Sequence, residues 1–219
     1  MDKSKVVEKV KELFTHVSEK KFVQTVDMIV NLKGINLKKP DEKVDFYQTL
    51  PKGKGKEITV CALIGPELKE SAEKAKVDFI LLEEFAKYSA EKKKAVALAQ
   101  KYNFFIAQAN LMGQVATNFG KVFGSRGRMP NPKAGCVVPP KTNLDPIVSK
   151  LRTTIRIVTK AQTTCQFPVG TTKMSPEDVA ENIVTCYEAI LHHLAQGKNN
   201  MKNASIKLTM SKSILLGDE

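Results

Sequence analysis

The chain of 219 residues contains no tryptophan, and only 6% of its residues are aromatic. Proteins that cage cationic ligands depend on exposed aromatic rings, so this class of binding protein is disfavoured. No apolar run is long enough to cross a bilayer, and the N-terminal residues lack the apolar segment of a signal peptide. We therefore expect a cytoplasmic protein that does not associate with membranes.

The chain has four cysteines and no Cys-x-x-Cys pair. Their wide spacing disfavours a disulfide framework and also a structural zinc site. Free cysteines are among the residues most often buried in proteins. We expect buried free thiols at Cys61, Cys136, Cys165 and Cys186, and no metal site.

Acidic residues are absent from Lys92 through Leu144, although this stretch holds nine lysines and arginines. The formal net charge of the whole chain is +12, and its acids lie mainly in the first 91 residues and between residues 177 and 188. A positive field segregated in this way attracts polyanions. Since a membrane partner is disfavoured, the charge favours nucleic acid.

The stretch from Phe119 to Pro140 is rich in glycine and proline and has basic but no acidic residues. This composition predicts a loop. Arg126, Arg128 and Lys133 are candidates for contact with phosphate, because guanidinium and ammonium groups donate to its oxygens. The alternative is an ordinary basic surface loop.

The hydrophobic pattern changes twice along the chain. The ends combine alternating strands with amphipathic helices: strands at 20–32, 44–50, 155–158, 163–167 and 204–210, and helices at 3–17 and 176–195. The middle alternates continuous apolar strands with helices: strands at 58–64, 77–82 and 104–107, and helices at 66–75, 84–101, 110–123 and 144–151. The second style is typical of a parallel α/β sheet.

The predicted fold class is therefore α/β and α+β in two domains. An α+β domain is expected from both chain termini, residues 1–53 and 153–219, with a Rossmann-like parallel α/β domain inserted at 54–152. The glycine-rich segment Pro51–Lys56 is expected to be a hinge between them, and Pro168–Gly170 a turn.

The first predicted strand has one apolar face, with Val26 and Met28, and one polar face, with Thr25 and Asp27. This alternation is typical of an antiparallel sheet that is exposed on one side. Phe22 at its start, beside a lysine, could stack on a base or a ribose while the lysine meets phosphate. The alternative is that Phe22 is a core residue.

We find no set of residues that would form a catalytic site, and we expect neither enzymatic activity nor a cofactor. The glycine-rich loop lacks the Gly-x4-Gly-Lys motif of nucleotide phosphate loops. One alternative is an enzyme for a phosphorylated small molecule, which predicts a pocket at the carboxyl ends of the strands at 58–64 and 104–107. Another is a general DNA-binding protein, which predicts similar affinities for DNA and RNA.

The segment Gly124–Gly135 reads Gly-Ser-Arg-Gly-Arg-Met-Pro-Asn-Pro-Lys-Ala-Gly. It resembles the Gly-Pro-Arg-Gly-x-Met-Pro-x-Pro signature of the L-one family of large-subunit ribosomal proteins, in its archaeal and bacterial forms. Five more segments match family motifs in the same order: Lys21–Asp27, Leu50–Lys56, Phe104–Ala109, Phe167–Gly170 and Leu208–Ser211. The resemblance covers essentially the whole chain and implies the same two-domain fold.

The resemblance also implies a function. Family members bind a stalk element of large-subunit rRNA, assist movement and release of tRNA at the exit (E) site, and repress translation of their own mRNA. This chain would act as a monomer within the ribosome. By the same resemblance, the RNA contacts would be Lys21, Phe22, Thr25, Asp27, Phe167, Gly170, Thr209, Met210 and Ser211.

Two residues depart from the family pattern. Ser125 stands where the family usually has proline, and we expect a looser loop there. Ser211 stands where it usually has glycine, and a Cβ at that place is expected to cost a contact or to shift the strand.

Overall fold

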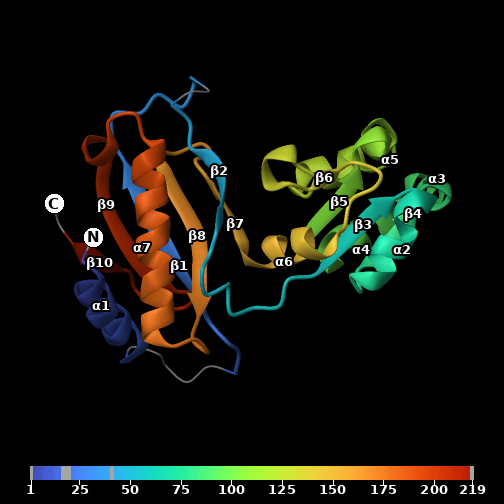
Figure 1. Cartoon of the computed structure of the whole chain (residues 1–219). Coiled ribbons are helices and arrows are strands. Elements are labelled where there is room, and N and C mark those ends of the chain that lie inside the picture. Colours follow the sequence, from blue (N-terminus) through green and yellow to red (C-terminus); the bar gives the residue numbers. More distant parts are fainter. Residues whose placement is uncertain (1, 16–20, 40–41, 218–219) are drawn as a thin grey trace. The chain divides into compact units, whose positions relative to one another are not determined.

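The computed structural model describes residues 2–15, 21–39 and 42–217. The chain divides into two compact units: unit 1 comprises residues 1–56 and 153–219, and unit 2 comprises residues 57–152. Unit 1 is thus built from both ends of the chain, whereas unit 2 is one continuous segment (Figure 1). Each unit has its own hydrophobic core.

Unit 1 is organised around a four-stranded antiparallel sheet. Its strands lie in the order β10 (Ile214–Gly217), β9 (Met201–Leu208), β1 (Thr25–Leu32) and β8 (Thr164–Thr171). Along β1, buried residues alternate with partly exposed ones, as the sequence predicted. The strand begins at Thr25, later than expected; residue 20, where the prediction placed its start, lies outside the described residues. β10 was not predicted.

Two helices cover the buried face of this sheet (Figure 1). They are α1 (Lys3–Thr15) and α7 (Pro176–His193), and α1 packs along α7. The end predicted for α1, at residue 17, lies outside the described residues. α7 begins where the sequence predicted, because Ser175 Oγ accepts a hydrogen bond from the Asp178 amide at 3.1 Å. A short 3-10 helix, η5 (Gly197–Asn200), then leads into β9.

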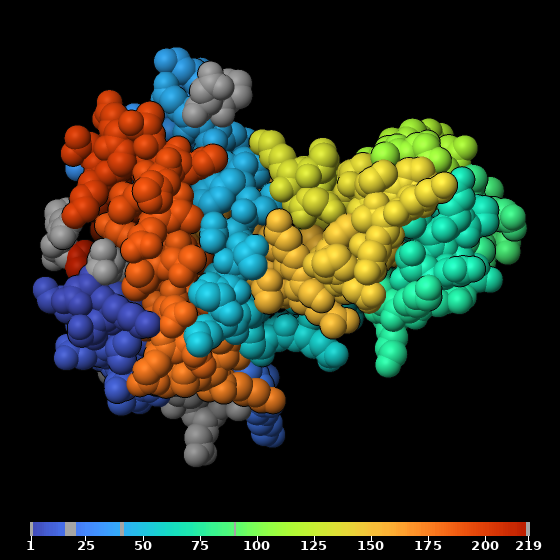
Figure 2. Space-filling model, in the orientation of Figure 1, coloured from blue at the N-terminus to red at the C-terminus, as the bar shows by residue number. Residues whose placement is uncertain are grey.

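A two-stranded antiparallel ribbon completes unit 1. It consists of β2 (Asp45–Thr49) and β7 (Thr154–Val158). The ring of Phe46 packs on that of His193 with their centroids 4.5 Å apart. Figures 1 and 2 show this side of unit 1, with α7 between α1 and β2. Arg156 joins the two strands by donating twice to the Asp45 carboxylate, at 2.9 Å each.

The turn predicted at Pro168–Gly170 is wrong, because these residues continue β8. The register passes from Val26 opposite Gly170 to Asp27 opposite Pro168, so Val169 is a bulge. β8 is an edge strand of its sheet, where a proline is tolerated because no second neighbour requires its missing N–H.

Unit 2 contains a parallel sheet, which confirms the predicted α/β character. Its order is β4 (Asp78–Leu81), β3 (Val60–Ile64), β5 (Phe104–Gln108) and β6 (Val137–Val138). Its helices are α2 (Lys69–Lys74), α3 (Phe85–Ala90), α4 (Lys92–Lys101), α5 (Met112–Ser125) and α6 (Asp145–Thr153). Four 3-10 turns accompany them: η1 (Pro66–Leu68), η2 (Leu82–Glu84), η3 (Ala109–Leu111) and η4 (Pro132–Ala134).

The single helix predicted over 84–101 is instead two helices, separated at Glu91. Glu91 ends α3 with a φ of −105° and a ψ of 83°, which lies outside the helical region. α4 then begins at Lys92, which is exposed, and buries Ala95 and Ala99.

The loop predicted over Phe119–Pro140 is wrong at two places. α5 continues to Ser125, and Val137–Val138 pair with β5 as strand β6. Phe119 and Phe123 explain the longer helix, because both are completely buried and their rings stack with centroids 5.0 Å apart. Burial of this pair outweighs the low helix propensity of the glycines between and beside them.

Candidate nucleic-acid interface

Two of the expected RNA contacts, Thr25 and Thr209, meet where β1 begins and β9 ends. The Thr25 amide donates to Thr209 Oγ1 at 3.2 Å, and the Thr209 amide donates to the Thr25 carbonyl oxygen at 3.2 Å. Residues separated by most of the chain are therefore held side by side at one end of the unit 1 sheet. The segments that precede Thr25 and follow Thr209 extend from this point.

Large apolar side chains are exposed beside these threonines. Phe22 is 51% exposed and Met210 is 64% exposed. Val23, the residue after Phe22, is exposed as well. The alternative that Phe22 is a core residue is therefore wrong. In the described part of the chain, the remaining large exposed apolar side chain is Leu215 of β10. Apolar groups gathered at one place on a basic protein mark a contact surface.

Gln24 connects the segments that carry these side chains. It is only 2% exposed, and its Oε1 accepts a hydrogen bond from the Met210 amide at 3.1 Å. Its carbonyl oxygen accepts from the Thr172 amide at 3.0 Å, which ties in the end of β8. Sequence reasoning missed this residue. The available signal was a polar residue in the inward phase of the strand, two positions before Val26.

Asp27 lies on the partly exposed face of the sheet. It stands opposite Lys207 in the neighbouring β9, and Gln166 Nε2 of β8 donates to its carboxylate at 3.3 Å. A carboxylate has about four acceptor positions, so this bond leaves most of them available. Lys21, the last of the four residues expected at this strand, is exposed. This surface therefore carries both a carboxylate acceptor, Asp27, and positively charged lysines.

Ser211 is bonded to the end of β9 through both its side chain and its backbone, and the effect of its Cβ on RNA contact stays a prediction. Its Oγ accepts a hydrogen bond from the Leu208 amide at 2.9 Å, and its own amide donates to the Leu208 carbonyl oxygen at 3.3 Å. The side chain thus closes the turn after β9. Among the described residues, Lys76 is the one non-glycine residue with positive φ, so Ser211 does not require a glycine conformation.

Phe167 and Gly170 do not present a surface to a partner. Phe167 is 2% exposed and belongs to the core of unit 1. A Cβ added to Gly170 would lie 3.0 Å from Val179 Cγ2 of α7. Both residues therefore hold β8 against α7, and their connection with RNA contact is indirect.

The three candidate residues of the basic loop in unit 2 differ in their exposure to solvent. Arg126 and Lys133 are exposed, whereas Arg128 is half-buried and donates through Nη1 to the Asn103 carbonyl oxygen before β5. Arg128 therefore fastens the loop to its own unit. Ser125 ends α5, and its Oγ donates to the Val122 carbonyl oxygen at 3.2 Å; the looser loop expected here stays a prediction.

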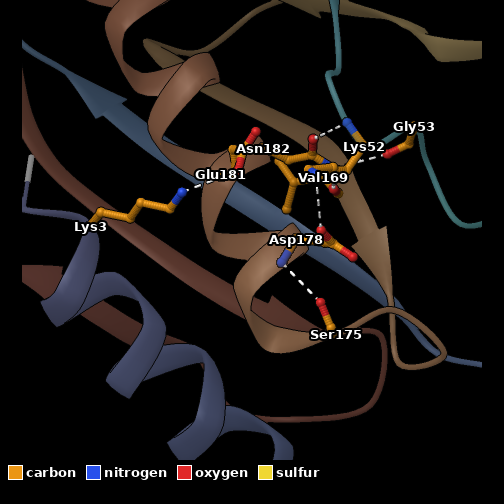
Figure 3. Close-up of polar contacts among 8 residues, drawn as sticks. All are labelled: Lys3, Lys52, Gly53, Val169, Ser175, Asp178, Glu181 and Asn182. Carbon is orange, nitrogen blue, oxygen red and sulfur yellow. Dashed lines mark hydrogen bonds and ion pairs between the residues drawn. The ribbon is translucent and has the colours of Figure 1, made fainter.

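Lys52 and Gly53, in the segment expected to be a hinge, are hydrogen-bonded to α7 of unit 1 (Figure 3). Asn182 of α7 donates to the Gly53 carbonyl oxygen at 2.9 Å and accepts from the Lys52 amide at 3.1 Å. Further along, Thr171 Oγ1 donates to the Gly55 carbonyl oxygen at 3.3 Å. The chain is thus hydrogen-bonded to unit 1 as far as Gly55. That Pro51–Lys56 acts as a hinge stays a prediction.

Gln108 lies at the carboxyl end of β5, one of the two strand ends where the enzyme alternative predicted a pocket. It is 1% exposed; its Oε1 accepts from the Gly65 amide at 2.9 Å and its Nε2 donates to Glu67 at 3.1 Å. Within residues 2–15, 21–39 and 42–217, no three histidines, cysteines or acids are grouped as metal ligands.

The four cysteines are buried and unpaired, as predicted. Burial raises the pKa of the Cys61 and Cys186 thiols to about 12, and that of the Cys136 and Cys165 thiols to about 11. These groups are neutral thiols at physiological pH and are poor nucleophiles.

Comparison with known proteins agrees with these features. The model of the ribosomal protein L1p/L10e family matches residues 13–212. The chain belongs to this family. It is 38% identical to the large ribosomal subunit protein uL1 of Pyrococcus abyssi, over 97% of this chain and 95% of that protein. The uL1 of Thermococcus kodakarensis is 39% identical over 97% of each chain.

A third uL1 protein, from Nanoarchaeum equitans, is 38% identical over 90% of this chain and 92% of its own. Membership of the L1p/L10e family confirms the resemblance read from the sequence and the two-part α/β and α+β fold class. Proteins of this family are structural parts of ribosomes, so the prediction of a protein without enzymatic activity is also confirmed. Among the described residues, no helix has both the length and the apolar character needed to span a membrane.

Proposed function

We propose that this protein is a structural component of the large ribosomal subunit that binds rRNA through the end of the unit 1 sheet. The observation that carries the proposal is the group of exposed apolar side chains, Phe22 and Met210, at the junction of Thr25 with Thr209. Exposed rings and thioethers pack on bases and riboses, and they cost free energy in water unless a partner covers them.

Polar groups at the same place suit ribose rather than phosphate alone. Asp27 and Thr25 lie on the partly exposed face of the sheet, and hydroxyl and carboxylate oxygens can accept from a ribose 2′-OH. A carboxylate would repel phosphate, so its presence on a surface built for RNA indicates a specific acceptor role. This argues for RNA over DNA, which lacks the 2′-OH.

The positive charge of the chain supplies the less specific part of the attraction. At a net charge of +12, cations meet phosphates and release counterions, which makes binding dependent on salt. Lys21 and Lys207 provide such charge near the proposed contact surface. We assign domain roles accordingly: the discontinuous domain, predicted as 1–53 and 153–219, binds rRNA, and the inserted domain, 54–152, serves as a mobile lever.

The finer functions follow from the family resemblance and are part of the same proposal. The inserted domain would present Arg126 and Lys133 to tRNA, and thereby assist movement and release of tRNA at the E site. The rRNA-binding surface would also recognise a similar element in the protein's own mRNA and repress its translation. The protein would act as a monomer on the ribosome.

A salt titration of binding tests the central proposal. The full-length protein is measured against an rRNA stalk fragment, a generic RNA duplex, and the DNA version of the fragment. We expect a preference for the stalk fragment that persists at physiological salt. Equal binding to all three that disappears together as salt rises would refute specific rRNA recognition and would leave general nucleic-acid binding.

Matched variants locate the surface. Phe22→Ala and Met210→Ala are expected to weaken binding to the stalk fragment by about tenfold or more, since a base stacked on a side chain contributes about 1–3 kcal/mol. Leu215→Ala is the control, because Leu215 is 48% exposed on β10, at the far edge of the sheet. An equal loss with Leu215→Ala would contradict the proposed location.

The tRNA and mRNA functions have separate tests. Arg126→Ala with Lys133→Ala is expected to weaken binding of deacylated tRNA to ribosomes carrying this protein, while leaving binding to the stalk fragment unchanged. A transcript of the protein's own mRNA leader is expected to compete with the stalk fragment, and Met210→Ala to weaken both equally. If the mRNA leader does not compete with the stalk fragment, the proposed repressor function is refuted.

A further inference from the structure

Gln24 is a buried polar residue of unit 1, and half of its side-chain amide has no hydrogen-bond partner in the described part of the chain. The Met210 amide donates to Oε1 at 3.1 Å, whereas Nε2 makes no hydrogen bond within the described part of the chain. In that part of the chain every side-chain nitrogen or oxygen that is sealed from solvent has a partner. Nε2 therefore reaches the surface, although the residue as a whole is 2% exposed.

The orientation of this amide follows from its one bond. A backbone N–H can only donate, so the atom that faces Met210 must be the oxygen. The NH₂ group is consequently the half that is turned away from the Met210 amide. Since the rest of Gln24 is packed in the protein, its two N–H donors are held in one place rather than moving with a free side chain.

The surroundings of this donor indicate what it can bind. Phe22 and Met210, the exposed apolar residues that precede and bond to Gln24, are suited to bases and riboses rather than to charged phosphate. A neutral amide is likewise suited to a base or ribose oxygen, and it gains little from a phosphate that surrounding lysines already attract.

We infer that Gln24 is a specificity-determining residue, whose side-chain amide donates a hydrogen bond to a base or ribose acceptor of the bound RNA. The inference rests on the proposed function, because it concerns the same surface. Gln24 then has two roles. Its Oε1 positions Met210 by accepting from the Met210 amide, and its NH₂ group donates to the RNA.

Two substitutions separate these roles. Gln24→Glu keeps an oxygen to accept from the Met210 amide but replaces the donors with a second oxygen. Gln24→Met fills a similar volume and removes both functions. Glu also adds a negative charge, so Gln196→Glu is the matched control; Gln196 is exposed beyond α7, near the opposite end of β9 from Thr209.

The experiment measures binding of each variant to the stalk fragment and to a generic RNA duplex at physiological salt. We expect Gln24→Glu to lose about tenfold in affinity for the fragment, as for a hydrogen bond of about 1.4 kcal/mol, beyond any change with Gln196→Glu. Binding to the duplex should change by no more than in the control. Hydrogen exchange should show the Met210 amide protected in Gln24→Glu and exposed in Gln24→Met.

Two results would overturn the inference. If Gln24→Glu binds the fragment like wild type while Gln24→Met does not, Gln24 only anchors the turn. If Gln24→Glu loses equally on both RNAs, the effect is one of charge. Neither result touches the proposed function, which fails separately if wild-type protein does not prefer the stalk fragment.

Discussion

The side-chain amide of Asn182 donates to the carbonyl oxygen of Gly53 at 2.9 Å, joining the middle of α7 to the chain just before unit 2 (Figure 3). The same nitrogen donates to the Val169 carbonyl oxygen at 2.8 Å, which belongs to the bulge of β8. A bulged residue is left out of the regular ladder, so Asn182 satisfies a carbonyl that the sheet does not. One buried side chain thus fixes both an edge strand and the linker.

Asn182→Ala is expected to destabilise unit 1 by about 2–4 kcal/mol, because it leaves buried backbone groups without partners. The Lys52 amide, which donates to Asn182 Oδ1, should then exchange with solvent more quickly. Asn182→Asp is the matched variant, since it keeps an acceptor for Lys52 but no donor. Urea unfolding and hydrogen exchange provide the measurement, and unchanged protection of Lys52 in Asn182→Ala would contradict the assignment.

Substitutions at two glycines of the linker allow the cost of backbone strain to be measured apart from the cost of a steric clash. Gly53 and Gly55 both have positive φ, 67° and 65°. A Cβ at Gly53 would approach only Thr153 Cγ2, at 3.9 Å, whereas at Gly55 it would lie 2.4 Å from Thr171 Oγ1. Gly53→Ala is expected to cost about 1–2 kcal/mol from conformation alone.

Gly55→Ala should cost about 1–2 kcal/mol more than Gly53→Ala, since Thr171 must also rotate and lose its bond to the Gly55 carbonyl oxygen. Denaturant unfolding of both variants, read through the circular dichroism of the full chain, gives the difference. An equal loss of unfolding free energy in both variants would mean that unit 1 accommodates a Cβ at Gly55 without further loss of stability.

Asp27→Ala tests whether an acid contributes to RNA recognition. We expect weaker binding to the stalk fragment, by about tenfold for one lost hydrogen bond, and unchanged or stronger binding to a generic RNA duplex. The opposite signs arise because the carboxylate repels phosphate but accepts from ribose or base donors. Asp27→Asn, which retains one acceptor oxygen, should lose less. Equal weakening on both RNAs would rule out the acceptor role.

In unit 2, the Tyr102 hydroxyl donates to Asp78, and Lys101 Nζ lies 3.4 Å from the same carboxylate oxygen. The hydrogen bond from Tyr102, followed by that from Lys101, lowers the pKa of Asp78 below its ordinary value of 3.8. A lowered pKa stabilises the folded state above pH 3.8, and this contribution is lost as pH falls through the folded pKa.

Tyr102→Phe should therefore lower the stability of unit 2 at neutral pH, by about 0.5–1.5 kcal/mol, and the difference from wild type should shrink in acid. At high pH the stability difference between wild type and Tyr102→Phe should also shrink, because wild type loses stability there. Burial, with the bond to Asp78, raises the pKa of Tyr102 above 10.0, so wild type loses stability as pH rises through that pKa and the Phe variant does not. Hydrogen exchange of β5 amides across pH measures this, and a pH-independent difference would contradict it.

The fold class, the burial of the four thiols and the one-sided sheet of unit 1 could all be predicted from the amino-acid sequence. These features depend on local periodicity: the alternation around Val26 and Met28 and the continuous apolar strand at 60–64 leave few other arrangements. The start of α7 was equally clear, because Ser175 and Pro176 are strong capping signals. Family motifs supplied the surface on which we place rRNA.

Other features depend on contacts between segments that are distant in the sequence. These contacts extend β8 through Pro168, because a proline is acceptable on an edge strand. They also divide the predicted helix at Glu91, whose backbone leaves the helical conformation. Phe22 lies at the surface and Phe167 in the core, although both are phenylalanines in family motifs. Local sequence does not encode which face a partner or a distant helix will cover. Gln24 and Asn182 acquire their roles from residues more than a hundred positions away.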